Sequence, residues 1–207
     1  MKLYDTPFAP NPRRVRWVMA EKDVSGVEIV AVDLMKGEHK QPAYLDKAGL
    51  AQLPALEFDD GTVITESIAI CRYLESRCPD PNLFGRTPEE TAVIEMWLRR
   101  AEMLVATPMM QWVRHTAPPL AVLEAPNPAV ADYQQAQGLK GLRVLDERLA
   151  GRDWLAADRL TIADIVAFIG LDFARMIRFR PPEELANLGR WVAAMRARPA
   201  AKAGMTA

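Results

Sequence analysis

The chain has 207 residues, of which 50% are hydrophobic and 26% charged, a composition typical of a soluble globular protein with one domain or two small ones. Lys and Arg number 26 and Asp and Glu 27, so a net charge of −1 excludes a bulk electrostatic attraction to nucleic acid or membrane. Two cysteines are too few for a secreted disulfide scaffold, and no apolar signal segment or membrane-length apolar run is present, so we expect a cytoplasmic protein.

The first part of the chain alternates short strand and helix patterns. Lys2–Asp5 is predicted to be a strand, and a proline-rich loop, Thr6–Pro12, leads from it into a helix pattern that runs from Arg13 to about Lys22. The β-branched run Val27–Val32 predicts a second strand. This βαβ order implies a parallel strand pair with a right-handed crossover.

A polar segment and a hairpin follow. Lys36–Leu50 contains glycine and proline breakers and is expected to be a loop with a short irregular helix. Pro54–Phe58 and Thr62–Thr65 flank an Asp-Asp-Gly turn signal, which predicts an antiparallel pair. Ser67 then begins an apolar helix. We therefore predict a small α/β domain with a mixed sheet over residues 1–80.

The rest of the chain lacks a convincing strand pattern. Thr87, Pro88 and Glu90 have the order of an N-cap, a first-turn proline and an acidic third position, which is typical of a helix start. Helical patterns then continue to about residue 114 and over residues 127–149, 161–176 and 182–198. We predict an all-α domain over residues 87–207, joined to the first by the linker Asp80–Thr87.

Three local features suggest a binding site for an extended ligand. Pro54 begins a strand, and if the Leu53–Pro54 bond is cis, the N–H and C=O of Leu53 turn outward, where a peptide can pair with them. The alternative interpretation is an ordinary edge proline.

The other two features are charged. Ser67 is a natural N-cap whose N–H and hydroxyl could hold a carboxylate, while Glu66 could meet an ammonium group; the alternative is a simple cap beside a solvated Glu. His39 and Lys40 could bind a second carboxylate, or could be a solvated pair. Together the features describe a peptide with an amino-acid head at one end and a carboxylate at the other, as in glutathione.

The chain resembles the glutathione transferases over nearly its whole length. The first domain is similar to their thioredoxin-like domain in the segments Arg13–Arg16, Gly37–Pro42, Gln52–Leu56 and Thr65–Ile70, most like the plant phi class and related bacterial enzymes. The segment Leu160–Ile165, after Trp154–Ala156, resembles the N-capping box of their all-α domain, with Thr161 as cap and Asp164 at the third position. We expect this box to serve folding.

The resemblance implies a fold, a ligand and an assembly. It implies an α/β thioredoxin-like domain followed by a helical domain, glutathione as co-substrate without a metal, and a homodimer. Carried over by motif, it places the glycine carboxylate at His39 and Lys40 with help from Gln52. It gives main-chain pairing to Leu53, with Pro54 cis, and the γ-glutamyl end to Glu66 and Ser67.

The chemistry implied is activation of the glutathione thiol, since only the thiolate attacks. The position of the activating serine in phi-like relatives is occupied here by Ala9, which cannot donate. Ala9-Pro10-Asn11 keeps the Pro-Asn of the Thr-Pro-Asn stretch in nu-like bacterial enzymes, so Asn11 is the leading donor and Thr6 the second candidate. The alternative for Asn11 is a turn residue before Pro12.

The electrophile is expected in an apolar pocket formed by Phe8, Met103, Trp112 and His115, although each of these residues could equally belong to ordinary helix core. Three functions stay open at this point. The chain is a glutathione transferase acting on apolar electrophiles, a glutathione-dependent disulfide or peroxide reductase, or a non-catalytic interaction protein of the same fold.

Overall fold

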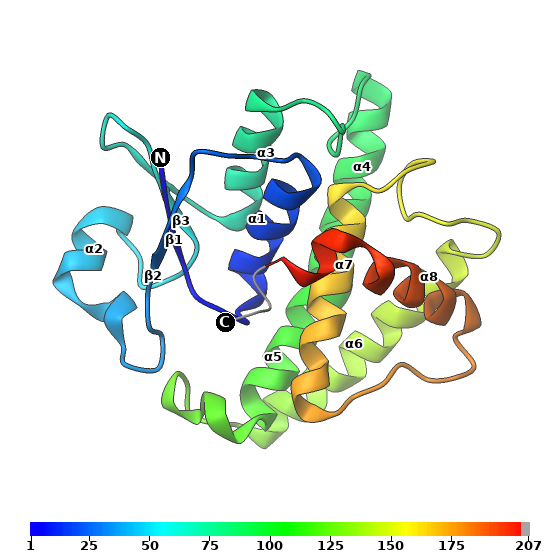
Figure 1. The fold of residues 1–207 in the computed structure, drawn as a ribbon. Helices are drawn as coiled ribbons and strands as arrows, with labels where there is room; N and C mark the ends of the chain where they lie inside the picture. Colours follow the sequence, from blue (N-terminus) through cyan, green and yellow to red (C-terminus); the bar gives the residue numbers. More distant parts are fainter. Residues whose placement is uncertain (204–207) are drawn as a thin grey trace. The chain divides into compact units, whose positions relative to one another are not determined.

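The structure, a computed structural model, describes residues 1–203. These residues form two compact units, one of Met1–Pro81 together with residues 202–203, and one of Asn82–Ala201. Figure 1 shows strands and helices in the first unit and helices in the second, which confirms the predicted fold class. No helix within residues 1–203 is long and apolar enough to cross a membrane.

The first unit is built on a four-stranded mixed sheet. Its strands are β1 (Lys2–Asp5), β2 (Glu28–Ala31), β3 (Ala55–Glu57) and β4 (Val63–Thr65), in the order β2-β1-β3-β4. The parallel β1–β2 pair and the antiparallel β3–β4 hairpin agree with the sequence prediction. The antiparallel β1–β3 pair closes the sheet.

Three α-helices cover this sheet. They are α1 (Pro10–Glu21), α2 (Pro42–Ala48), which follows a short 3-10 turn (η1, Glu38–Lys40), and α3 (Ser67–Arg77). The prediction that the first helix begins at Arg13 is wrong. Pro10 and Pro12 belong to its first turn, where proline is tolerated because the N–H it lacks would have no partner within the helix.

Two faces of the sheet carry separate apolar layers. Leu3 lies opposite Leu56 and Tyr4 opposite Ala55, and neighbouring residues of a strand point to opposite faces. Tyr4 and Ala55 form a cluster with Val32, Tyr44 of α2 and Leu53. Figure 1 shows α2 on one side of the sheet and α1 and α3 on the other, the side to which the buried Leu3 and Leu56 point.

The second unit contains five α-helices: α4 (Pro88–Arg100), α5 (Thr107–Thr116), α6 (Pro128–Arg148), α7 (Ile162–Phe173) and α8 (Ala186–Ala197). Thr87 caps α4 as predicted, with its Oγ1 accepting from the Glu90 N–H at 3.2 Å. The last helix begins at Ala186 and not at Pro182, so that boundary was placed too early.

The predicted capping box at the start of α7 is present and has a wider structural role. Asp164 accepts hydrogen bonds from the N–H groups of Thr161 and Leu155, at 3.0 and 2.9 Å, and from the Trp191 indole at 3.2 Å. Burial raises the pKa of Asp164 to about 6, although these donors act in the opposite direction. The carboxylate therefore joins three separated segments of the unit.

The sequence patterns did not reveal the π-helical segment η2 (Ala101–Ala106), which joins α4 to α5. Helices α6 and α7 pass very close to it through glycines. A Cβ atom on Gly141 would lie 1.9 Å from the Leu104 carbonyl oxygen, and one on Gly170 would lie 2.4 Å from the Ala106 Cα. Both contacts are with backbone, so neither can be relieved by moving a flexible side chain.

We expect Gly141→Ala to destabilise the protein by about 1–3 kcal/mol, because the added methyl group must displace the η2 backbone. Gly189→Ala is the matched control. Gly189 lies in α8 with open space around its Cβ position, so this change should stabilise by about 0.5–1 kcal/mol. Urea unfolding measures both, and equal stability of the two variants would contradict the close approach of α6 to η2.

Candidate functional site

The strand register brings one end of β1, β3 and β4 together. Tyr4 pairs with Ala55, which pairs with Thr65. The end of β1, the start of β3 and the end of β4 therefore lie along the same edge of the sheet, meaning the edge at which strands begin and end and not an outer strand. The chain enters β3 from Pro54 and leaves β4 toward α3, while β1 leads toward α1. Residues far apart in the sequence therefore meet at this edge.

A small hollow at this edge collects six of the nine residues predicted to bind glutathione or to activate its thiol. It is lined by Asn11, Leu50, Gln52, Leu53, Pro54, Thr65, Glu66 and Ser67. Its enclosed volume is about 10 Å³, enough for roughly one water molecule. An extended ligand would therefore lie across the hollow with one group inserted.

The segment before β3 has the main-chain geometry on which the binding hypothesis depends. The Leu53–Pro54 peptide bond is cis. The β3 ladder begins at Ala55, so Leu53 lies outside it. The carbonyl of the preceding Gln52 accepts a hydrogen bond from the Tyr44 hydroxyl.

The turn from β4 into α3 is strained. Glu66 occupies the N-cap position with φ 66° and ψ 114°, a conformation that costs a residue with a side chain about 1–3 kcal/mol. The prediction that Ser67 is the cap is wrong, because Ser67 is the first helical residue and Glu66 carries the turn. The Ser67 side chain is buried and its Oγ accepts from Arg14 Nη1 at 3.3 Å, while Glu66 is exposed.

The first turn of α1 presents few main-chain donors. Within Pro10–Pro12 only Asn11 carries a main-chain N–H, because both neighbours are prolines. Ala9 occupies the N-cap position without a side-chain cap. The buried Oδ1 of Asn11 has no hydrogen-bond partner among the described residues. Asn11 thus brings one main-chain donor and one amide side chain to the hollow.

Three of the other predicted residues lie outside this lining. Thr6 is buried, and its carbonyl accepts from Arg16 Nη1 at 3.3 Å. His39 is buried with an unpartnered Nδ1, and burial, with the nearby Lys40 charge, lowers its pKa, so the imidazole is neutral at pH 7. Lys40 is exposed and keeps its charge available to a ligand.

The residues predicted to contact an electrophile belong to different units. Phe8, in the first unit, is half exposed at φ 64°. In the second unit Met103 is exposed on η2, and the Trp112 ring packs edge-on against Phe179 at 5.0 Å. His115 Nε2 lies 3.8 Å from Glu124 Oε1. Neither unit by itself contains the predicted pocket.

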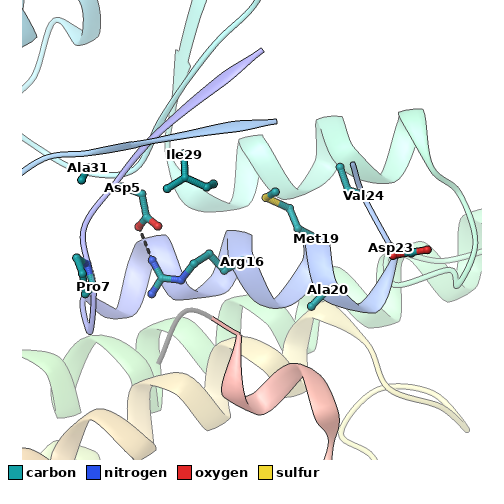
Figure 2. Close-up of a pocket in the computed structure, with 9 residues that line it drawn as sticks. All are labelled: Asp5, Pro7, Arg16, Met19, Ala20, Asp23, Val24, Ile29 and Ala31. Carbon is teal, nitrogen blue, oxygen red and sulfur yellow. Dashed lines mark hydrogen bonds and ion pairs between the residues drawn. The ribbon is translucent and has the colours of Figure 1, made fainter. Parts of the chain in front are cut away.

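A larger pocket of about 490 Å³ in the first unit is lined by none of the predicted site residues (Figure 2). Figure 2 shows Arg16 reaching from α1 to Asp5 at the end of β1, with which it forms a buried ion pair. The remaining lining residues are Pro7, Met19, Ala20, Asp23, Val24, Ile29 and Ala31. The guanidinium and carboxylate neutralise each other, and the lining contains no thiol, hydroxyl or imidazole side chain.

Both cysteines are free. Cys71 is completely buried, and this burial raises the pKa of its thiol to about 12, so it stays protonated at neutral pH. Within residues 1–203 there is no group of three or more His, Cys, Asp or Glu side chains arranged to hold a metal ion. The chemistry available at the hollow is that of amide, hydroxyl and main-chain donors together with the Glu66 carboxylate.

Comparisons with known proteins match both units. Residues 1–76 match the family model for the glutathione S-transferase N-terminal domain, and residues 105–199 match the model for the C-terminal domain. Glutathione S-transferase 2 of Saccharomyces cerevisiae is 38% identical over 98% of this chain and 88% of its own length.

A solved structure and a relative named as an isomerase are also similar to this chain. The crystal structure of Gtt2 from Saccharomyces cerevisiae superposes with a TM-score of 0.91 at 38% identity, covering 98% of this chain and 99% of that one. The maleylacetoacetate isomerase of Pseudomonas aeruginosa is 30% identical over 80% of this chain and 77% of its own length.

The strain at Glu66 gives a test of the site geometry. We expect Glu66→Gly to be more stable than Glu66→Ala by about 1–2 kcal/mol, because glycine adopts φ 66° without steric cost. The same pair of changes at Arg143, an exposed position inside α6, should give the opposite order, since glycine is the poorer helix former. Denaturant unfolding of the four variants measures both differences. A less stable glycine variant at both positions would contradict the strained turn.

Proposed function

The chain belongs to the glutathione S-transferase family, and we propose that it binds glutathione across the hollow at Pro54 and activates the thiol for attack on apolar electrophiles. The observation that carries the proposal is the convergence of Asn11, Leu53, Glu66 and Ser67 on one hollow. These residues come from three segments that the register of the sheet brings together: the first turn of α1, the segment before β3 and the turn from β4 into α3. A glutathione transferase needs all three segments at once, because glutathione has two charged ends and a thiol between them.

The γ-glutamyl end of glutathione carries an ammonium and a carboxylate. The exposed Glu66 carboxylate suits the ammonium. The Ser67 N–H lies at the positive end of α3, and its hydroxyl, which accepts from Arg14, still has its own proton to donate to the ligand carboxylate. The buried position of Ser67 makes these contacts stronger than they would be in water.

The cysteinyl residue in the middle of glutathione and the glycine at its end need different partners. The N–H and C=O of Leu53, outside the β3 ladder, pair with the cysteinyl main chain of the ligand. Gln52 and Lys40 take the glycine carboxylate, with Lys40 supplying the charge. His39 is neutral at pH 7 because burial lowers its pKa, so it acts as a hydrogen-bonding group.

Thiol activation falls to Asn11. Lowering a thiol pKa from about 8.5 to about 6.5 requires about 2.7 kcal/mol in favour of the thiolate. Since Ala9 has no side-chain donor, the Asn11 amide and its main-chain N–H supply hydrogen bonds, and the positive end of α1 favours the negative charge. The thiol proton passes to solvent, the sulfur lone pair forms a bond to the electrophilic carbon, and the leaving group departs with the electron pair of its own bond.

The electrophile and the cellular role belong to the same proposal. Phe8 of the first unit provides apolar surface for the electrophile, while Met103, Trp112 and His115 of the second unit stay predicted contacts. Conjugation of the electrophile in the cytoplasm would serve detoxification. The two free thiols suit a reducing compartment. Family membership does not choose the substrate, since one relative is named as an isomerase.

We propose that the chain forms a homodimer, as the family does in general. Val93, Met96 and Leu104 are exposed apolar residues along α4 and η2. Apolar residues spaced in this way on one helical stretch suit a partner surface better than solvent.

Asn11→Ala tests the thiol assignment. We expect kcat/KM for an apolar chloronitrobenzene electrophile to fall about tenfold to hundredfold, because a hydrogen bond to a charged group is lost. The pKa of the bound glutathione thiol, followed through the ultraviolet absorbance of the thiolate, should rise. Glutathione affinity measured at about pH 5, where the bound thiol is protonated in both proteins, should stay within about twofold. Thr6→Val is the control and should leave the pKa of the bound thiol unchanged.

Other results would redirect the proposal. If Asn11→Ala left the thiol pKa unchanged, the side-chain amide of Asn11 would not be the donor. Turnover of disulfides or hydroperoxides alone would identify a reductase. If glutathione failed to raise the unfolding temperature of the wild-type chain, glutathione would not be its ligand, because a ligand that binds only the folded state must stabilise it.

Met96→Glu tests the homodimer. A buried charge at an interface is costly, so we expect this variant to shift toward the monomer in light scattering, while the wild-type chain is dimeric. Met176→Glu, at another exposed methionine outside α4 and η2, should leave the dimer intact. A monomeric wild-type chain at micromolar concentration would contradict the proposal.

A further inference from the structure

Helix α2 and the turn before it carry two of the proposed glycine-end ligands, yet they have few buried contacts. His39 and Lys40 lie in η1, directly before α2. Within α2, Pro42–Ala48, Tyr44 is the buried residue, with 5% of its surface exposed. Of the two buried side chains of this segment, His39 of η1 and Tyr44 of α2, Tyr44 is the one that packs into the apolar cluster of the sheet.

Tyr44 reaches two elements of the first unit. Its ring packs edge-on against Tyr4 of β1 at 5.9 Å, inside the apolar cluster that includes Leu53 and Ala55. Its hydroxyl donates a hydrogen bond to the carbonyl of Gln52. Burial raises the pKa of Tyr44 to about 12, so the phenol keeps its proton and remains a donor throughout the neutral range.

A hydrogen bond to the Gln52 carbonyl also affects the main-chain N–H of Leu53. It belongs to the peptide unit that joins Gln52 to Leu53, and both residues line the hollow. Holding that carbonyl fixes the orientation of the Leu53 N–H, because the two groups share one planar peptide. The Tyr44 hydroxyl thus acts on the main-chain group assigned to pair with the ligand.

The second tie between α2 and the sheet is weaker. Lys47 Nζ lies 3.1 Å from Glu57 Oε2, and the Tyr4 hydroxyl donates to the same carboxylate. The Lys47 side chain is 46% exposed. Exposed ion pairs contribute little, so this contact cannot replace the Tyr44 hydrogen bond.

We propose that Tyr44 is a positioning residue, whose hydroxyl ties α2 to the Gln52–Leu53 peptide and so pre-organises both the main-chain donor and the glycine-end ligands for glutathione. The inference rests on the proposed function for its ligand. Tyr44 itself touches no reacting atom, so its loss should affect ground-state binding of glutathione and leave the chemical step alone.

The test is Tyr44→Phe, which keeps the ring and removes the hydrogen bond. We expect KM for glutathione to rise about threefold to tenfold, the range expected for one neutral hydrogen bond, with kcat within about twofold. KM for the electrophile should not change. Hydrogen exchange should become faster for the main-chain amides of α2 and of Leu53.

Tyr73→Phe is the matched control. Tyr73 is a partly buried tyrosine of the same unit that packs against Phe58, and its hydroxyl contacts Met1 Sδ at 3.4 Å. This variant should leave KM for glutathione and exchange in α2 unchanged.

Two outcomes would overturn the inference: an unchanged KM in Tyr44→Phe, or a fall in kcat equal to the loss in kcat/KM. Hydrogen exchange separates this failure from that of the proposed function. If wild-type protein did not bind glutathione, the proposed function would fail. Unchanged hydrogen exchange of the α2 amides in Tyr44→Phe would by itself overturn the positioning role of Tyr44.

Discussion

The antiparallel register of β1, β3 and β4 is the constraint on which the candidate site depends. It places the end of β1, the start of β3 and the end of β4 at one edge of the sheet. Two helices therefore begin beside the same cis peptide bond, and each brings the positive end of its dipole to the hollow. A slip of one residue between β3 and its neighbours would turn the side chains of β3 to the opposite face and separate Pro54 from Glu66.

The remaining features of the first unit support this edge at some cost in stability. Glu66 holds a conformation that disfavours any residue with a side chain, and Asn11 keeps a buried oxygen without a partner. Strained and unsatisfied groups of this kind are characteristic of binding sites. In the second unit, the closest contacts instead hold helices and loops together. They are the hydrogen bonds to the Asp164 carboxylate and the packing of helix glycines against η2. The close contacts of the second unit therefore serve packing, whereas the strained and unsatisfied groups named above lie at the candidate site.

Much of the fold could be predicted because its signals are local. The hairpin turn, the Thr87 cap and the Thr161–Asp164 box each depend on residues within a few positions of one another, and all are present. The start of α1 was misplaced because proline was read as a loop signal although it is tolerated in a first turn. The π-helical segment packs against α6 and α7 through glycines that lie far away in the sequence, and a local sequence pattern cannot reveal such contacts. For the same reason Tyr44 gave no signal, since its partner Gln52 becomes recognisable only once α2 is placed on the sheet.

A crystal structure of the chain with glutathione bound tests the central claim most directly. The account predicts that the cysteinyl main chain pairs with Leu53, that the γ-glutamyl head contacts Glu66 and Ser67, and that the sulfur lies within hydrogen-bonding distance of the Asn11 amide or N–H. Glutathione bound away from Pro54, or a sulfur whose donor comes from another residue while Asn11 faces elsewhere, would contradict it.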